Sequence, residues 1–296
     1  MHQNPSLIIK DSTKFRAPEI PADGDPEVTT WCDRHGVPGA FSHVVNEERW
    51  LHVLGVASFK LDLADNTVVA VPWKDARTET IVNEFQSTVW PTVLQIQGCE
   101  ALHASAVSTP LGVVTFCAAS EGGKSTLAYA LSWRGYAHWA DDAVVLEISP
   151  GLVRAHPLPF QIRLRSDAAL HFGYSVDQVE GGRLRYNKGQ QHAEVVPLRA
   201  ICLLQAETLP ESRAIKIEPL IGASALLGVL EHALYFSLQD PQRKRRMMQQ
   251  YLNLVGQVPI FAVHMGRGLE LLPRIVDQLE KDILASCQKR ALSIHQ

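Results

Sequence analysis

The stretch from residue 101 to residue 147 constrains this chain more than any other. An apolar run at residues 113–117 leads into a short polar loop, and a helical pattern follows the loop. A phosphate-binding loop needs this context, with a strand before it and a helix after it. Backbone N–H groups at a helix start, aided by the helix dipole, attract phosphate oxygens. The residues predicted to bind nucleotide phosphates are Ser120, Glu121, Gly122, Gly123, Lys124, Ser125 and Thr126.

Length and composition fit a globular protein. The chain has 296 residues, of which 46% are hydrophobic and 20% charged, enough for one large domain or two modest ones. The net charge of −3 provides no global basic field for nucleic acid or an anionic membrane. No apolar run reaches the roughly 18 residues that span a bilayer, and the first residues lack the apolar stretch of a secretory signal. Scattered cysteines without a CxxC pair indicate reduced thiols. We therefore predict a cytoplasmic protein with neither nucleic-acid nor membrane partners.

Periodicity divides the chain into three parts. Residues 1–49 are rich in Pro, Asp and Glu and predict an arm or loops. Residues 50–99 predict a small α+β module, with a β-hairpin around Asp65-Asn66 and a helix at 78–97 that breaks near Pro91. Residues 100–296 alternate strands and helices, which predicts an α/β domain.

Within that domain, individual elements follow from the same patterns. Ser166 is expected to cap a short helix, and residues 176–193 are expected to form a polar loop near a site. Strands are expected at 104–107, 113–117, 136–140, 143–148, 198–204 and 258–263, and helices at 124–134, 166–172, 223–236, 241–255 and 271–284.

Three elements in a fixed order give the chain a family resemblance. They are Leu102-His103-Ala104-Ser105, the loop at 118–125, and Gly135 followed by Ala140-Asp141-Asp142. Together they resemble the HPr kinase/phosphorylase family, which carries a strand histidine, a Gly-x-x-Gly-x-Gly-Lys-Ser loop and an Asp-Asp element in this order. The flanks are similar to kinases encoded beside peptide natural-product pathways, lasso peptides among them. The resemblance covers about residues 50–210 and is strongest at 101–148.

The resemblance implies a P-loop core of the HPr-kinase type, related to PEP carboxykinase, that uses ATP and Mg²⁺. Such an enzyme transfers the γ-phosphoryl group to a hydroxyl of a peptide or protein Ser/Thr, or of a small molecule. Asp141 would be the general base, and His103 would support the transferred phosphate. Lys124 would reach the terminal phosphates, while Ser125 and Asp142 would hold the metal. The family often assembles, so a homo-oligomer is open. No counterpart of the C-terminal signature by which HPr kinases engage HPr is present.

Two residues depart from the family's loop, because Ala118 and Glu121 stand where it has glycines. A Cβ at Ala118 is tolerated only if φ is negative there. The Glu121 carboxylate repels phosphate unless it turns outward or meets a cation. Two alternatives therefore stand beside the kinase: a catalytically weak, nucleotide-binding scaffold in a biosynthetic complex, and a phosphorylase that runs the reverse reaction.

Cations gather in the turn-rich centre of the chain. Arg163 and Lys188 are the candidates for a clamp on phosphate or on an acidic acceptor. The basic run at 242–246 predicts a solvated helix face, with a docking patch for an acidic peptide as the alternative. The central cations are Arg163, Arg165, Arg183, Arg185 and Lys188.

Overall fold

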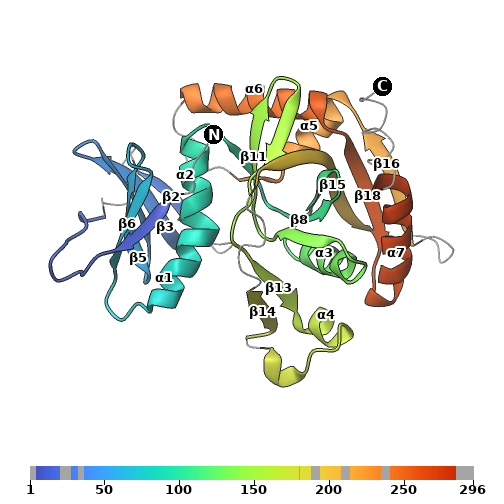
Figure 1. Cartoon of the computed structure of the whole chain (residues 1–296), viewed down its shortest axis with the longest axis horizontal. Helices are drawn as coiled ribbons and strands as arrows, with labels where there is room; N and C mark the ends of the chain where they lie inside the picture. The colour runs from blue at the N-terminus through green and yellow to red at the C-terminus, as the bar shows by residue number, and fades with distance from the viewer. Residues whose placement is uncertain are drawn as a thin grey trace. The chain divides into compact units, whose positions relative to one another are not determined.

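The computed structural model divides the chain into two compact units (Figure 1). It describes residues 5–20, 28–32, 37–179, 181–187, 194–207, 214–234 and 241–284. The first unit consists of Met1–Cys99 with Tyr235–Arg246, and the second of Glu100–Leu234 with Met247–Gln296. Lys188, with the rest of 188–193 in the predicted loop, therefore lies outside the described residues.

The first unit is built on a six-stranded sheet with the order β1-β6-β5-β4-β3-β2. All neighbouring strands are antiparallel except β1 and β6, which run parallel. The strands are β1 (Ser6–Ile9), β2 (Thr29–Cys32), β3 (Pro38–Val45), β4 (Glu48–Val53), β5 (Ala57–Asp62) and β6 (Thr67–Pro72).

The predicted arm at 1–49 is therefore wrong for β1, β2 and β3, which belong to this sheet. The predicted boundary at residue 50 falls inside β4. In β3 only His43 is fully buried, so the strand lacks the apolar alternation that would reveal it. The turn from β3 to β4 is made by Asn46 and Glu47, which both have positive φ, at +50° and +67°. Positive φ at both central residues is the backbone of a tight hairpin turn.

The hairpin of β5 and β6 and the broken helix after it agree with the sequence. The helix runs as α1 (Thr78–Glu84), a π-helical turn (Phe85–Val89) and α2 (Trp90–Ile96). Pro91 has no N–H to bond the carbonyl four residues earlier, and wide turns of this kind occur where that ladder is interrupted.

The second unit is a mixed α/β structure around a ten-stranded sheet. Its long strand β15 (Val196–Glu207) runs parallel to β9 and β18 and antiparallel to β12. The other strands are β7 (Glu100–Leu102), β8 (Ala104–Thr109), β9 (Gly112–Cys117), β10 (Ala137–Ala140), β11 (Val144–Ser149), β12 (Leu152–Ala155), β16 (Ile215–Leu220), β17 (Ala233–Leu234) and β18 (Ile260–Gly266). The predicted α/β class is confirmed, while a core of the HPr-kinase type stays a prediction.

Most helices of this unit match the predicted positions within two residues, but the helix predicted at 223–236 ends at Leu230, because Ala233 and Leu234 pair with β7 as strand β17. The helices are α3 (Lys124–Trp133), α4 (Ser166–His171), α5 (Gly222–Leu230), α6 (Pro241–Gln257), α7 (Leu272–Leu279) and a closing π-helical turn (Glu280–Leu284). α6 continues across the division between the units. Ser166 is not the cap of α4, because the N-cap position belongs to Arg165, whose side chain makes no capping hydrogen bond.

The core of the second unit lies between α3, α7 and the sheet. Leu127 and Leu131 of α3 are buried in one apolar cluster with Phe116 of β9 and Ile275 of α7. Burying such side chains contributes about 1.5–3 kcal/mol each. Because β9 and α3 are both held by this cluster, the loop that joins them has fixed ends.

A separate two-stranded ribbon carries most of the central cations. β13 (Gln161–Arg165) pairs antiparallel with β14 (Arg183–Asn187), so the predicted loop at 176–193 is wrong for 183–187. Ile162, Leu164 and Leu184 form the buried side of this ribbon and cluster with Tyr129 of α3. The Arg-Leu-Arg alternation of β14 is the strand signal, and it is short and preceded by Gly181-Gly182.

Candidate active site

The predicted phosphate loop connects the end of β9 to the start of α3. Gly123 is the N-cap of α3, with φ at +88°, a conformation that suits glycine. Lys124, the first residue of the helix, is buried, and its Nζ donates to the carbonyl oxygens of Ala118 at 3.0 Å and Ala119 at 3.4 Å. Burial lowers the pKa of Lys124, against the raising effect of Asp142, Cys117 and Asp141. The cationic end of the lysine thus lies inside the curve of the loop.

The two departures from the family's glycines have different consequences. Ala118 does not have a positive φ, so its Cβ carries no backbone strain. A Cβ on Gly122 would lie 2.6 Å from the Ala118 Cβ, so glycine is required at residue 122 once residue 118 has a side chain. Glu121 has φ at +65°, in the left-handed region that disfavours residues with a Cβ.

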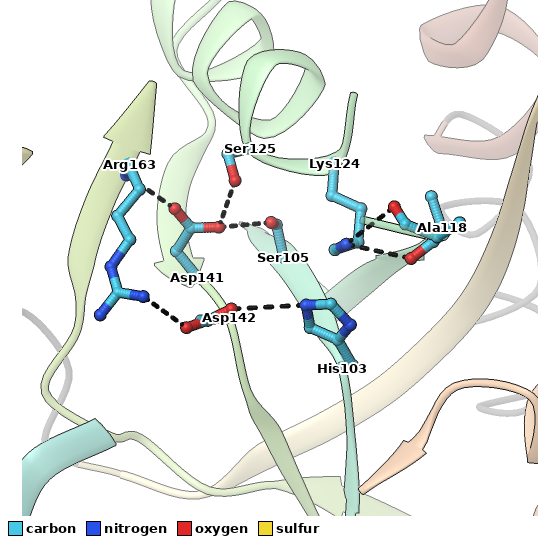
Figure 2. A network of polar contacts seen from close by, with 9 residues as sticks. His103, Ser105, Ala118, Lys124, Ser125, Asp141, Asp142 and Arg163 are labelled. Carbon is cyan, nitrogen blue, oxygen red and sulfur yellow. Dashed lines mark hydrogen bonds and ion pairs between the residues drawn. The ribbon is translucent and has the colours of Figure 1, made fainter. Parts of the chain in front are cut away.

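Asp141, at the end of β10, accepts three hydrogen bonds. Its Oδ1 accepts from the hydroxyls of Ser105 at 2.5 Å and Ser125 at 2.8 Å. Its Oδ2 accepts from the backbone N–H of Arg163 at 3.0 Å. Figure 2 shows this carboxylate between β8, α3 and β13. Burial raises the pKa of Asp141, and the hydrogen bonds from Ser105, Arg163 and Ser125 oppose that rise.

Asp142 follows with a strained backbone, since its φ is +74°. Its Oδ2 accepts from Arg163 Nη1 at 2.8 Å, and its Oδ1 lies 3.4 Å from His103 Nε2 (Figure 2). The hydrogen bond from His103 lowers the pKa of Asp142, and the charges of Arg163, His103 and Lys124 add to this effect. The N–H of His103 donates to the carbonyl of His232 at 2.7 Å, which fixes the backbone from which the imidazole extends.

The structure brings the predicted site residues together in one pocket. Every candidate within the described residues lines it, whereas Lys188 lies outside them. Arg165 and Arg183, which sequence reasoning left among the general cations, line the same pocket, and their strand alternation was the available signal. The lining residues are His103, Ser120, Glu121, Gly122, Gly123, Lys124, Ser125, Thr126, Asp141, Asp142, Arg163, Arg165 and Arg183.

The pocket supplies the ligand types that Mg²⁺ prefers. The Ser125 hydroxyl and the carboxylates of Asp141 and Asp142 are hard oxygen donors, and magnesium in nucleotide sites takes only one or two carboxylates beside phosphate oxygens. In the part of the chain that the structure describes, no group of three or more His, Cys, Asp and Glu side chains could hold a metal ion.

Comparison with known proteins gives no sequence match and a weak similarity to solved structures. No family model matches the chain, and no curated protein matches it. One solved structure with a similar course is described as "Structure of the Hpr(Ser) kinase/phosphatase from Coxiella burnetii", at 15% identity and a TM-score of 0.34. The match covers 66% of this chain and 96% of that chain. Among the described residues, no helix is long and apolar enough to cross a membrane. At this level of similarity, neither family nor activity follows from the match.

Proposed function

We propose that the protein is an ATP-dependent kinase that transfers the γ-phosphoryl group to a hydroxyl. The observation that carries the proposal is the hydrogen bond from Ser125, in the phosphate loop, to Asp141, in the paired aspartates. Two sequence elements that the resemblance treats as parts of one site therefore meet in one pocket. Phosphoryl transfer requires mainly positioning and charge neutralisation, for which these groups are suited.

Lys124 and the loop amides would bind the phosphates. The Nζ of Lys124 now bonds two loop carbonyls, which are uncharged acceptors. Phosphate oxygens carry more charge and form stronger hydrogen bonds with an ammonium group. We therefore infer that the lysine exchanges these carbonyls for phosphate oxygens when nucleotide binds.

Ser125 and Asp142 would hold Mg²⁺, with Asp141 within reach through its bond to Ser125. When bound, the metal ion neutralises charge on the phosphate oxygens. The lowered pKa of Asp142, caused first by the His103 hydrogen bond, keeps this carboxylate ionised, as a metal ligand must be.

Asp141 would accept the proton of the attacking hydroxyl. Burial raises the pKa of Asp141, and a base whose pKa is closer to the working pH accepts a proton more readily. The contact between Asp141 and Ser125 favours the opposite assignment of roles to the two aspartates. In that assignment Asp141 binds the metal and Asp142 faces the acceptor. The two assignments predict different phenotypes: loss of the base lowers kcat, and loss of the metal ligand raises the Mg²⁺ requirement.

Incubation with γ-labelled ATP, Mg²⁺ and arrays of serine and threonine peptides, together with small hydroxyl compounds, tests the activity. Transfer of label to an acceptor is expected, and Asp141→Asn should abolish it. ATP binding without transfer to any acceptor, unchanged by that substitution, would support the nucleotide-binding scaffold instead. Glu121 is the observation that favours this second candidate, because it places a carboxylate in the phosphate loop. Release of pyrophosphate from a phosphorylated acceptor and phosphate would indicate the reverse reaction.

A further inference from the structure

The outer face of the β13–β14 ribbon carries four arginines. Arg163 and Arg165 are two residues apart on β13, so they share a face, and Leu164 between them is buried on the other. The register places Arg163 opposite Arg185, and Arg165 opposite Arg183. Like charges directly opposite each other destabilise a strand pair. The packing of the ribbon therefore gives no reason for four arginines on one face, whereas binding of anions does.

Three carboxylates of the chain already neutralise part of this face: those of Asp142, of Glu121 and of Asp167, whose Oδ1 lies 3.5 Å from Arg165 Nε. Asp142 forms an ion pair with Arg163, with Oδ2 2.8 Å from Nη1, next to the predicted point of phosphoryl transfer. Glu121 takes the other pair: its Oε2 lies 3.0 Å from Arg165 Nη1, and its Oε1 lies 3.9 Å from Arg183 Nη2. Each oxygen of the glutamate thus faces a different arginine. The arrangement is that of a carboxylate held between two guanidinium groups.

Stability does not explain Glu121. Its backbone is in the left-handed region, which costs energy for a residue with a Cβ. The Glu121 side chain is 50% exposed, and those of Arg165 and Arg183 are 54% and 46% exposed. Ion pairs this exposed contribute little to stability. The backbone of Glu121 is therefore strained and its ion pairs are weak, so a competing anion can displace the Glu121 carboxylate from the two arginines.

We propose that Arg165 and Arg183 form a carboxylate subsite for the acceptor, and that Glu121 fills this subsite until an acidic peptide replaces it. This inference rests on the proposed kinase function and names the substrate class. The ribbon positions beside Asp142 and beside Glu121 are two residues apart, roughly 7 Å in a strand. An extended peptide spans the same distance with two residues. The acceptor is therefore a serine or threonine with an acidic residue two positions away.

A positional peptide array tests the subsite. Each peptide carries one serine and a single Glu at one of the four positions on either side, and its matched control carries Gln at the same position. With labelled ATP, incorporation should be highest for Glu two residues from the serine, and about tenfold lower for the Gln control. The double substitution Arg165→Gln/Arg183→Gln should remove this difference. Lys216→Gln, on β16 and outside the pocket, should retain it.

Glu121→Gln supplies the complementary measurement. It keeps the size of the side chain but removes the competing charge, so the Kd of the best acidic peptide should fall about fivefold, equivalent to about 1 kcal/mol. The Kd of the Gln control peptide should stay the same. If Glu121→Gln tightens both peptides equally, the glutamate does not compete for a carboxylate subsite and the proposal is wrong.

Binding of fluorescent protein to the same array separates this inference from the kinase proposal. Selective retention on the acidic peptides without label transfer would support the subsite and reject the kinase. Transfer without any Glu preference, or with a preference that survives the double substitution, would reject the subsite and keep the kinase. A change confined to the Kd of ATP in the double variant would assign both arginines to the nucleotide and overturn the inference.

Discussion

The hydroxyl of Ser125 donates a 2.8 Å hydrogen bond to Asp141, which joins the first turn of α3 to the end of β10. If Mg²⁺ binds at Ser125, Ser125→Ala should raise the Mg²⁺ concentration needed for half-maximal activity by about 10–100-fold. The metal would lose the hydroxyl ligand, and Asp141 would lose the hydrogen bond that holds it beside the metal. Ser125→Thr keeps the hydroxyl and is the matched control. Titration of activity with Mg²⁺ at saturating ATP measures the effect, and equal Mg²⁺ requirements in the alanine and threonine variants would contradict it.

Substitution of each aspartate separates the base from the metal ligand. Asp141→Asn should lower kcat by about 10²–10⁴-fold, the typical contribution of a general base. Asp142→Asn should mainly raise the Mg²⁺ concentration needed for half-maximal activity. The reversed pair of phenotypes would exchange the two roles.

The pH dependence of wild-type activity also distinguishes Asp141 from Asp142 as the general base. Only an ionised carboxylate accepts a proton, so activity should be lost as the pH falls through the pKa of the base. Burial raises the pKa of Asp141, so this acid limb should lie above the usual aspartate range. A limb at or below that range would point to Asp142, whose pKa is lowered.

Gly122 and Ala118 should be coupled. Gly122→Ala places a Cβ 2.6 Å from the Ala118 Cβ, and the resulting shift of the loop should cost about 1–3 kcal/mol, as overpacking does. Ala118→Gly alone should have a small effect, and the double substitution should recover most of the loss. Denaturant unfolding of the four proteins measures this cycle, and additive losses would show that the two positions do not interact.

Replacement of Glu121 separates backbone strain from charge. Glu121→Ala removes the ion pairs but keeps the strain of a Cβ in the left-handed conformation. Glu121→Gly removes the ion pairs and also this strain. The glycine variant should therefore be more stable than the alanine variant by about 1 kcal/mol. If the carboxylate also hinders nucleotide, both variants should bind ATP about tenfold more tightly, while a fall in affinity would contradict this picture of the loop.

Buried histidines of the first unit should make its stability depend on pH. His52 bonds Ser58 at 2.8 Å and His43 at 2.9 Å, and burial, with the nearby His43, lowers the pKa of His52 to about 4. The unfolded chain binds this proton near pH 6.5, so the contribution is complete above pH 6.5 and lost as the pH falls toward about 4. Unfolding free energies should fall by on the order of 3 kcal/mol over this window. A His52→Gln variant with the same pH slope would refute the assignment.

The sequence predicted the site better than the sheets around it. Residues 118–123 lie between a buried strand and an apolar helix, and both have strong local patterns, so the loop could be placed from sequence. β3 was missed because most of its side chains are only partly buried, which leaves no alternation to detect. β14 was missed because five residues with charged flanks look like a loop until the partner strand is known.

The partners of individual site residues were beyond sequence reasoning. Nothing local indicates that the hydroxyls of Ser105 and Ser125 share one oxygen of Asp141, since the three residues come from separate elements. The pairing of Glu121 with Arg165 joins positions 44 residues apart. Such contacts depend on the strand register, which becomes known only with the fold.

The position of Tyr129 has a mechanical consequence. Helix α3 carries Lys124 and Ser125 in its first turn, and Tyr129, little more than one turn later, packs among the apolar side chains of the arginine ribbon. The Tyr129 hydroxyl also bonds that of Tyr174, 2.6 Å away, in the segment between α4 and β14. Helix α3 thus contacts the predicted phosphate loop at its N-terminal end and the arginine ribbon along its side. Any tilt of α3 would therefore move the predicted phosphate loop and the ribbon together, and the pocket between them would keep its shape.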